Sequence, residues 1–255
     1  MEPITIDFTT CGESVPEALE KIGAAAVLQK QKQVLIKPNL VTAAPHPITT
    51  GTDLCRAVIE YLRSVSAAEV IIAEGTGEAG LTTGEVYARL GYDELARECQ
   101  LELIDLNQAP LRRLENKSCR FFPEIYLPEI IFSHFIISLP VLKAHSLSGI
   151  TGTMKNMIGV IPPGHYGGGS GSWKKALVHE KIHEAVFELN RYRCPDLTVL
   201  DARIGLADYH LGGRRCHPPV GKILAGFDPL LLDRAAAELL GLDWRSIAHL
   251  HDSQP

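Results

Sequence analysis

The sequence predicts a single α/β domain built on a mainly parallel β-sheet, with helices on both faces in a Rossmann-like layering. Short apolar runs typical of buried strands alternate with stretches of helical periodicity, which is the pattern of βαβ units. The length of 255 residues is near the upper size of one compact domain. With 45% hydrophobic and 22% charged residues, the composition is that of an ordinary globular protein. We therefore expect one domain over residues 1–250 and a frayed tail over 251–255.

The first predicted strand and helix follow from a β-branched run and an apolar stripe. Residues 34–37 predict a strand that opens into a loop at Pro38, because proline does not continue a central strand. Apolar residues at helical spacing predict a helix over 54–64, and Thr52 and Asp53 are placed to cap it.

The next unit repeats this alternation. Residues 69–73 and 101–105 predict two strands. Between them, a helix is expected to begin at about residue 83, because Thr82 and Glu85 have the spacing of a capping box.

The second half of the chain is less regular. The expected elements are, in order, a hairpin or edge extension over 111–128, a strand over 135–139, a helix over 154–158, a glycine-rich loop over 159–173, a helix over 174–190, strands over 197–200 and 222–225, a helix over 229–240 and a last turn over 244–250. A loop of about 15 residues inside a compact domain is usually functional or disordered.

Three lysines stand where a parallel sheet presents its ligand site. Lys37 lies at the end of one predicted strand, and Lys143 and His145 directly follow another. Lys155 is near the start of a predicted helix. Ligands of open parallel sheets bind beyond the carboxyl ends of the strands, so these amino groups are expected to face one anion. The alternative is that they are unrelated, solvated lysines.

Neutral polar residues accompany the lysines. Asn39, Asn156 and Thr153 are expected to bind the same ligand. In the glycine-rich loop, His165 and Tyr166 are expected to close over it as a lid that excludes water, although a plain surface loop is the alternative.

Asp201 ends the predicted strand 197–200. It is expected to orient a lysine or a histidine, or to bind a metal. A structural ion pair explains it equally well.

A glycine pattern follows the strand 69–73. Gly75, Gly77 and Gly80 have the G-x-G-x-x-G spacing of a dinucleotide-binding loop. However, the capping box places the helix start beyond Gly80, and Glu74 would repel a phosphate. We therefore favour a glycine-rich loop at the rim of the site, in which Gly75 and Gly77 contact the ligand.

His179 and His183 form a literal H-E-x-x-H motif, the spacing of a zinc site on a helix. No third ligand stands where such metalloproteases keep one, and both histidines flank an apolar stripe. Packing alone explains them, and binding of a divalent metal or an anion is the alternative.

Composition excludes several classes of function. The net charge of -5, without a basic stripe, argues against nucleic-acid binding. The first residues do not resemble a signal peptide, and no apolar run is long enough to span a membrane, so we expect a cytoplasmic protein. The six cysteines contain no C-x-x-C pair, which argues against an iron–sulfur cluster or a zinc ribbon within this chain.

Several of these segments together resemble the domain of unknown function 362 family. They are residues 34–40, Lys143 with His145, residues 152–159, residues 196–201, and residues 225–229 with Asp233. Many members of that family carry an attached ferredoxin-like iron–sulfur module, and we expect this chain to be a stand-alone member without it. The resemblance implies that seven residues gather in one place, namely Lys37, Asn39, Lys143, His145, Lys155, Asn156 and Asp201.

Three functions remain in competition. The first is an enzyme or ligand-binding protein for a small carboxylate or phosphate, with His145 transferring a proton and Lys143 and Asp201 assisting. The second is a redox accessory protein that works with a separate ferredoxin-like partner and holds a metal or cluster through histidines and cysteines. The third is a nucleotide-dependent oxidoreductase that uses residues 75–80.

Overall fold

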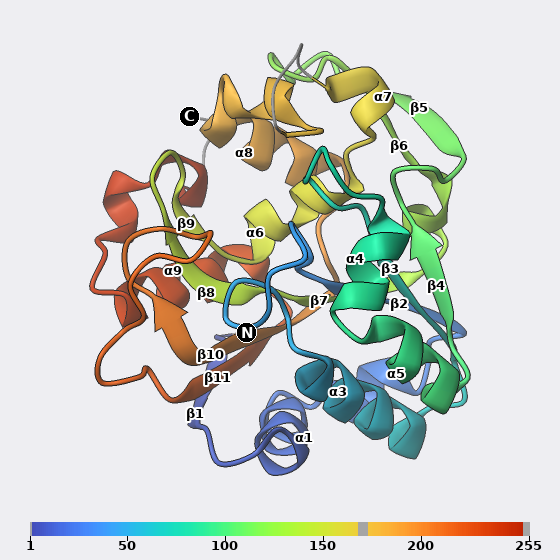
Figure 1. Cartoon of the computed structure of the whole chain (residues 1–255), viewed down its shortest axis with the longest axis vertical. Helices are drawn as coiled ribbons and strands as arrows, with labels where there is room; N and C mark the ends of the chain where they lie inside the picture. Colours follow the sequence, from blue (N-terminus) through green and yellow to red (C-terminus); the bar gives the residue numbers. More distant parts are fainter. Residues whose placement is uncertain (1, 168–172, 252–255) are drawn as a thin grey trace.

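A computed structural model describes residues 2–167 and 173–251 of the chain. Its centre is a nine-stranded sheet, and seven strands form the main path (Figure 1). In spatial order these are β1 (Ile4–Asp7), β11 (Lys222–Gly226), β10 (Leu197–Leu206), β7 (Phe135–Leu139), β2 (Gln33–Pro38), β3 (Glu69–Glu74) and β4 (Glu102–Asp105). Neighbours from β10 to β4 are parallel, whereas β1 and β11 are antiparallel. The predicted mainly parallel α/β sheet is confirmed.

Helices cover both faces of the sheet, as the alternation of side chains along β2 requires. Val34 and Ile36 pack into one apolar cluster, and Leu35 packs into the cluster on the opposite face. Figure 1 shows α1 (Cys11–Lys21) and α3 (Thr52–Val65) on one side of the sheet. On the other side lie α6 (Thr153–Asn156), α8 (Ile182–Tyr192) and α9 (Pro229–Leu239).

The remaining elements complete these layers. They are α2 (Ala24–Leu28), α4 (Thr83–Arg89), α5 (Tyr92–Cys99), α7 (Pro163–Tyr166), the hairpin strands β5 (Leu111–Glu115) and β6 (Glu124–Pro128), and the 3₁₀ turns η1 (Glu129–Phe132), η2 (Met157–Val160), η3 (Ala176–His179), η4 (Trp244–Ser246) and η5 (Ala248–Leu250). The predicted hairpin within 111–128 forms. In the described part of the chain, no helix combines the length and the apolar character needed to cross a bilayer.

Two predicted helix starts have different outcomes. The capping box of Thr82 and Glu85 is present at the start of α4. In contrast, α3 begins at Thr52 after Gly51, without a side-chain cap, so the predicted capping role of Thr52 and Asp53 is wrong. The carboxylate of Asp53 instead forms an ion pair with Arg203 of β10.

The segment after Pro140 is itself a strand, whereas the sequence analysis placed Lys143 and His145 beyond a strand end. Here β8 (Val141–His145) pairs with β10 in parallel and with β9 (Gly149–Thr151) antiparallel. Proline cannot donate to a strand ladder, so the chain breaks at Pro140 and pairs again one residue later. The pairing is possible because β10 is ten residues long and extends well beyond the expected 197–200.

The single helix expected over 174–190 is divided. The turn η3 ends at His179 and α8 begins at Ile182, with Lys181 between them at φ -138° and ψ 65°. His179 and His183 therefore do not share one helix, as the H-E-x-x-H interpretation required. The expected loop 159–173 contains the end of η2 and the whole of α7, and its residues 168–172 lie outside the described residues.

Candidate functional site

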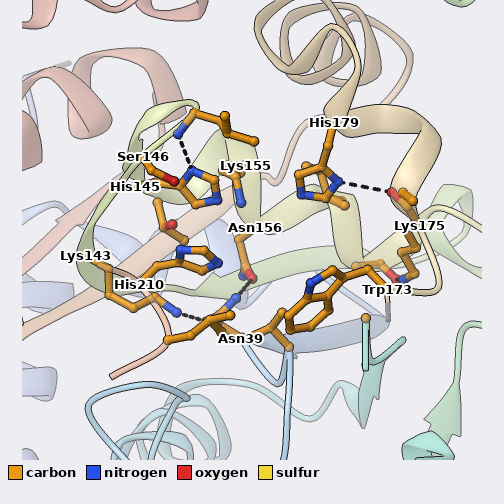
Figure 2. A pocket seen from close by; sticks show the side chains of 18 of the residues that line it. Asn39, Lys143, His145, Ser146, Lys155, Asn156, Trp173, Lys175, His179 and His210 are labelled. Atoms are coloured by element: carbon orange, nitrogen blue, oxygen red, sulfur yellow. Dashed lines mark hydrogen bonds between the residues drawn. The ribbon is translucent and has the colours of Figure 1, made fainter. Parts of the chain in front are cut away.

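A cavity of about 330 Å³ lies beyond the carboxyl ends of β2 and β3, bounded by β8 and by the segment that carries η3. Lys143, Lys155 and Lys175 line it together with one carboxylate, that of Glu74. Three histidines also line it, namely His145, His179 and His210. Figure 2 shows the three lysines and the three histidines converging from separate segments of the chain.

The carboxylate of Glu74 is neutralised beneath the cavity. Lys37 donates from Nζ to Glu74 Oε2 at 2.7 Å, and both side chains are buried. The backbone N–H of Gly75 donates to Glu74 Oε1 at 2.8 Å. Burial lowers the pKa of Lys37 and the charge of Glu74 opposes this shift. Lys37 is thus a buried ion-pair partner and does not line the cavity.

An amide chain connects this ion pair to Lys143. Asn156 Oδ1 accepts from Lys37 Nζ at 3.3 Å and from Asn39 Nδ2 at 3.0 Å. Asn39 Oδ1 in turn accepts from Lys143 Nζ at 2.7 Å, and the carbonyl of Ile48 accepts from the same amino group at 2.6 Å. Burial, assisted by the nearby charge of Lys155, lowers the pKa of Lys143 to about 7.

Lys175 is a site residue that the sequence analysis missed. Its buried Nζ donates to the carbonyl oxygens of Gly75 and Gly159, both at 2.7 Å. Burial lowers its pKa to about 7. The sequence predicts Lys175 at the start of an ordinary amphipathic helix, where a lysine is usually solvated. Nothing in the neighbouring residues indicates that it is buried.

Lys155 differs from the other three lysines because, within the described residues, its ammonium has no hydrogen-bond or ion-pair partner. It retains some exposed surface, but protein atoms surround it closely enough that burial lowers its pKa to about 8. The helix that carries it is held by the buried carboxylate of Asp233, which accepts from the backbone N–H groups of Thr153 at 2.6 Å and Met154 at 2.9 Å.

His145 is held in one tautomer. Its Nδ1 accepts from the backbone N–H groups of Leu147 at 3.1 Å and Ser148 at 3.2 Å. An Nδ1 atom that accepts carries no proton, so the neutral ring carries its proton on Nε2. That Nε2 is buried without a partner. Burial and the nearby Lys155 move the pKa of His145 far below its usual range, which keeps the ring neutral.

His179 is held in the opposite tautomer. Its Nδ1 lies 3.2 Å from the carbonyl oxygen of Lys175, and a carbonyl only accepts, so Nδ1 carries the proton. The lone pair on Nε2 is therefore left for a ligand. Burial and the charge of Lys155 lower the pKa of His179. The cavity thus combines a donating imidazole, an accepting imidazole and the ammonium of Lys155, which has no partner in the part of the chain that the structure describes.

His210 completes the histidine cluster from the loop after β10. Its ring stacks on that of His145 with centroids 4.0 Å apart, and its Nδ1 is buried without a partner. Burial and the charges of Lys155 and Lys143 lower its pKa to about 3. The sequence analysis did not single it out, because only the fold brings residue 210 to the end of β8.

A family model identifies the family to which the chain belongs. The model of the family described as "Domain of unknown function (DUF362)" matches residues 34–238, which is more than half of the sequence. The chain belongs to this family. The family resemblance proposed from the sequence is thereby confirmed, and no curated protein matches the DUF362 chain.

Two solved structures share the fold. The lactate racemase apoprotein from Thermoanaerobacterium thermosaccharolyticum superposes with a TM-score of 0.51 at 11% identity, over 92% of this chain and 56% of that one. A Thermotoga maritima protein determined by the Northeast Structural Genomics Consortium superposes with a TM-score of 0.53 at 14% identity, over 95% of this chain and 60% of that one. The DUF362 chain therefore spans less than two thirds of either structure.

Two of the predicted site residues lie in other interactions. Asp201 is buried in an ion pair with Arg203 at 2.7 Å, and its carboxylate also lies 3.1 Å from His46. His183 faces His249, with their Nδ1 atoms 2.9 Å apart. Neither residue lines the cavity, and the part of the chain that the structure describes contains no group of three or more His, Cys, Asp or Glu residues arranged to hold a metal ion.

The predicted lid residues pack against the hairpin instead of the cavity. His165 stacks on Tyr126 of β6 with ring centroids 4.2 Å apart. The hydroxyl of Tyr166 accepts from the backbone N–H of Tyr126 at 2.9 Å. Neither residue lines the cavity in this arrangement, because α7 is anchored on β6. Their role as a lid stays a prediction.

The remaining predicted residues divide between the cavity and its support. Gly75 and Gly77 line the cavity together with Asn39 and Asn156. A side chain at Gly75 would meet the carbonyl of Gly159 at 2.6 Å, so a glycine is required there. Thr153 is buried in the support of α6 and does not line the cavity.

Proposed function

We propose that the DUF362 protein binds a small anion, a carboxylate or a phosphate, in this cavity and transfers a proton to or from it. One observation carries the proposal: among the described residues the ammonium of Lys155 has no partner, and the cavity that it lines also contains the buried Nε2–H of His145, which has none there either. A buried donor without a partner, such as His145 Nε2–H, is rare and costly, and an anion bound between it and the ammonium of Lys155 satisfies both donors at once.

The other lysines support the cavity and do not compete for the anion. The charge of Lys37 is balanced by Glu74, and Lys143 and Lys175 donate to amide and carbonyl oxygens. Because these acceptors are neutral, the positive charges of Lys143 and Lys175 are only partly compensated. The anion is thus drawn to a positive cavity and bonded directly by Lys155, where a charge-assisted hydrogen bond contributes about 1.5–3 kcal/mol.

The two tautomers divide the proton chemistry. His145 was the expected proton carrier, but its tautomer suits it to donate a hydrogen bond to a negatively charged oxygen without giving up its proton. The accepting Nε2 of His179 suits that residue to be the general base. The similar racemase apoprotein takes its name from lactate, a small carboxylate, and this agrees with a carboxylate ligand.

Thermal unfolding tests the proposal. We expect at least one member of a panel of small carboxylates and phosphates to raise the melting temperature, since a ligand at 100 times its Kd adds about 2.7 kcal/mol to stability. Lys155→Met should abolish the rise. Lys117→Met, which changes an exposed lysine outside the cavity, should leave it intact. A panel without effect, or equal shifts in both variants, would overturn the assignment.

A further inference from the structure

The exposed apolar side chains of the described residues concentrate at the mouth of the cavity. Among the described residues, three large hydrophobic residues are exposed, namely Leu111 at 36%, Leu147 at 56% and Tyr209 at 46%. Two of them, Leu147 and Tyr209, line the cavity. Leu111 lies on the hairpin strand β5.

The inner end of the cavity is polar and closed. Lys143 is fully buried, and the side chains of His145 and Asn39 are 4% and 8% exposed. The ring of Tyr209 packs edge-on against His210 at a centroid distance of 5.0 Å, and His210 stacks on His145. The aromatic contacts therefore run continuously from the exposed mouth to the buried polar end.

The wall between these two ends is largely apolar. Val41, Ile158 and Trp173 line it. In Figure 2, Trp173 lies on one side of Asn156, and His210 and Lys143 lie on the other. The volume of about 330 Å³ falls within the range of roughly 300–1,000 Å³ that is typical of pockets for drug-sized ligands, so a carboxylate group alone leaves most of the space unfilled.

We infer that the ligand is amphipathic, with an anionic head at Lys155 and a hydrocarbon or aryl body that packs against Trp173, Leu147 and Tyr209. This inference rests on the proposed function, because it places the head at the anion site. An apolar body shields side chains that otherwise face water, which explains why the mouth carries exposed apolar residues.

A chain-length series tests the inference. Straight-chain carboxylates from acetate to octanoate are titrated into the 255-residue chain by calorimetry. In parallel, fluorescence is recorded in a Trp244→Phe variant, where Trp173 is the remaining one of the two tryptophans. We expect each added methylene to tighten binding about fourfold until the cavity is filled, since burying a CH₂ group contributes about 0.8 kcal/mol. Trp173 fluorescence should change with the longer acids.

Variants of the apolar residues test whether the gain in affinity with chain length arises at the mouth of the cavity. Trp173→Ala should weaken octanoate binding about tenfold or more and leave acetate binding within about twofold. Leu147→Ser and Tyr209→Ser alter exposed side chains and provide the same comparison if the tryptophan variant does not fold. Equal affinity for all chain lengths, or an undiminished gain in these variants, would overturn the inference and leave the anion site standing. Failure of every acid to bind would overturn the inference, and the proposed function falls with it only if the phosphates of the thermal panel also leave the melting temperature unchanged.

Discussion

Lys155 combines two properties that rarely occur together in a folded protein, a crowded environment and an ammonium without a partner among the described residues. Maintaining a cation there opposes folding, because the native environment disfavours the charged form. Such a cost is typical of residues retained for binding a ligand. The effect of Lys155 on the free energy of unfolding can be measured separately from its effect on ligand affinity.

Replacing Lys155 by methionine should stabilise the ligand-free protein at pH 7 by about 1–3 kcal/mol, because the substitution removes a partly desolvated charge. The native pKa is lowered to about 8 from 10.5, so between these pH values the unfolded chain binds more protons than the native protein. The stability of the wild type therefore rises with pH in this window. The advantage of the variant should be largest below pH 8 and shrink toward pH 10.5, as measured by urea unfolding at several pH values.

The matched exposed variant Lys117→Met provides the control. It should show no pH-dependent difference from the wild type over the same window. A Lys155→Met protein that is less stable than the wild type at pH 7 would mean that the ammonium has a stabilising partner, and our description of the site would be wrong.

His179 should carry the proton transfer. If its Nε2 is the general base, the protein should accelerate exchange of the C3 protons of 2-oxobutanoate with deuterium oxide, followed by ¹H NMR, because Lys155 can bind the carboxylate while His145 Nε2–H donates to the adjacent enolate oxygen. His179→Gln should slow the exchange about a hundredfold or more. His183→Gln alters a histidine paired with His249 outside the cavity and should leave the rate unchanged. Equal losses in both variants would show that His179 is not the base.

Two short structural elements set the geometry of the cavity. The helix α6 has only four residues and depends on Asp233 of α9, whose carboxylate accepts both N–H groups at its start. Asp233→Ala should cost about 1–3 kcal/mol of stability, because it leaves two buried donors without an acceptor. It should also weaken anion binding, since α6 carries Lys155. Urea unfolding and calorimetry measure the two effects, and an unchanged affinity would mean that α6 keeps its position without Asp233.

The turn η2 controls the approach of the chain to the ion pair below the cavity. A side chain at Gly159 would collide with Glu74 and lie 2.6 Å from Lys37 Nζ, whereas one at Gly164 would meet nothing within 4 Å. Gly159→Ala should therefore cost about 3–5 kcal/mol by separating a buried pair. Gly164→Ala in α7 should change stability by no more than about 1 kcal/mol. Similar stability of the two variants in denaturant would contradict the close approach at Gly159.

At this scale, sequence reasoning succeeded where periodicity was strong and failed where tertiary pairing decided. The apolar runs of β2, β3 and β7 were sufficient to predict strands. The strand β8 was missed because Pro140 looks like a strand end, and its partners are the unexpectedly long β10 and the three-residue β9. The break at Lys181 was missed because the apolar stripe continues through it.

For the whole molecule, the positional rule for parallel sheets was the most informative inference. The rule selected Lys37 and Lys143, of which Lys143 lines the cavity and Lys37 lies in the ion pair beneath it. The family resemblance implied that His145, Lys155 and the two asparagines gather there as well, and these four residues line the cavity. The sequence does not reveal which lysine ammonium has an ion-pair partner in the folded protein. Nothing in the sequence distinguishes Lys37 from Lys155. In the folded chain, Glu74 forms an ion pair with Lys37 and not with Lys155. The tautomers of His145 and His179 depend likewise on backbone groups that the fold brings near.

The most direct test of this account is a crystal structure of the protein soaked with 4-bromobenzoate, in which the anomalous signal of bromine locates the ligand. The account predicts the carboxylate within about 3 Å of Lys155 Nζ and near His145 Nε2, with the bromine directed toward the mouth of the cavity. A ligand bound at another surface, with Lys155 and His145 making no contact to it, would contradict the anion site.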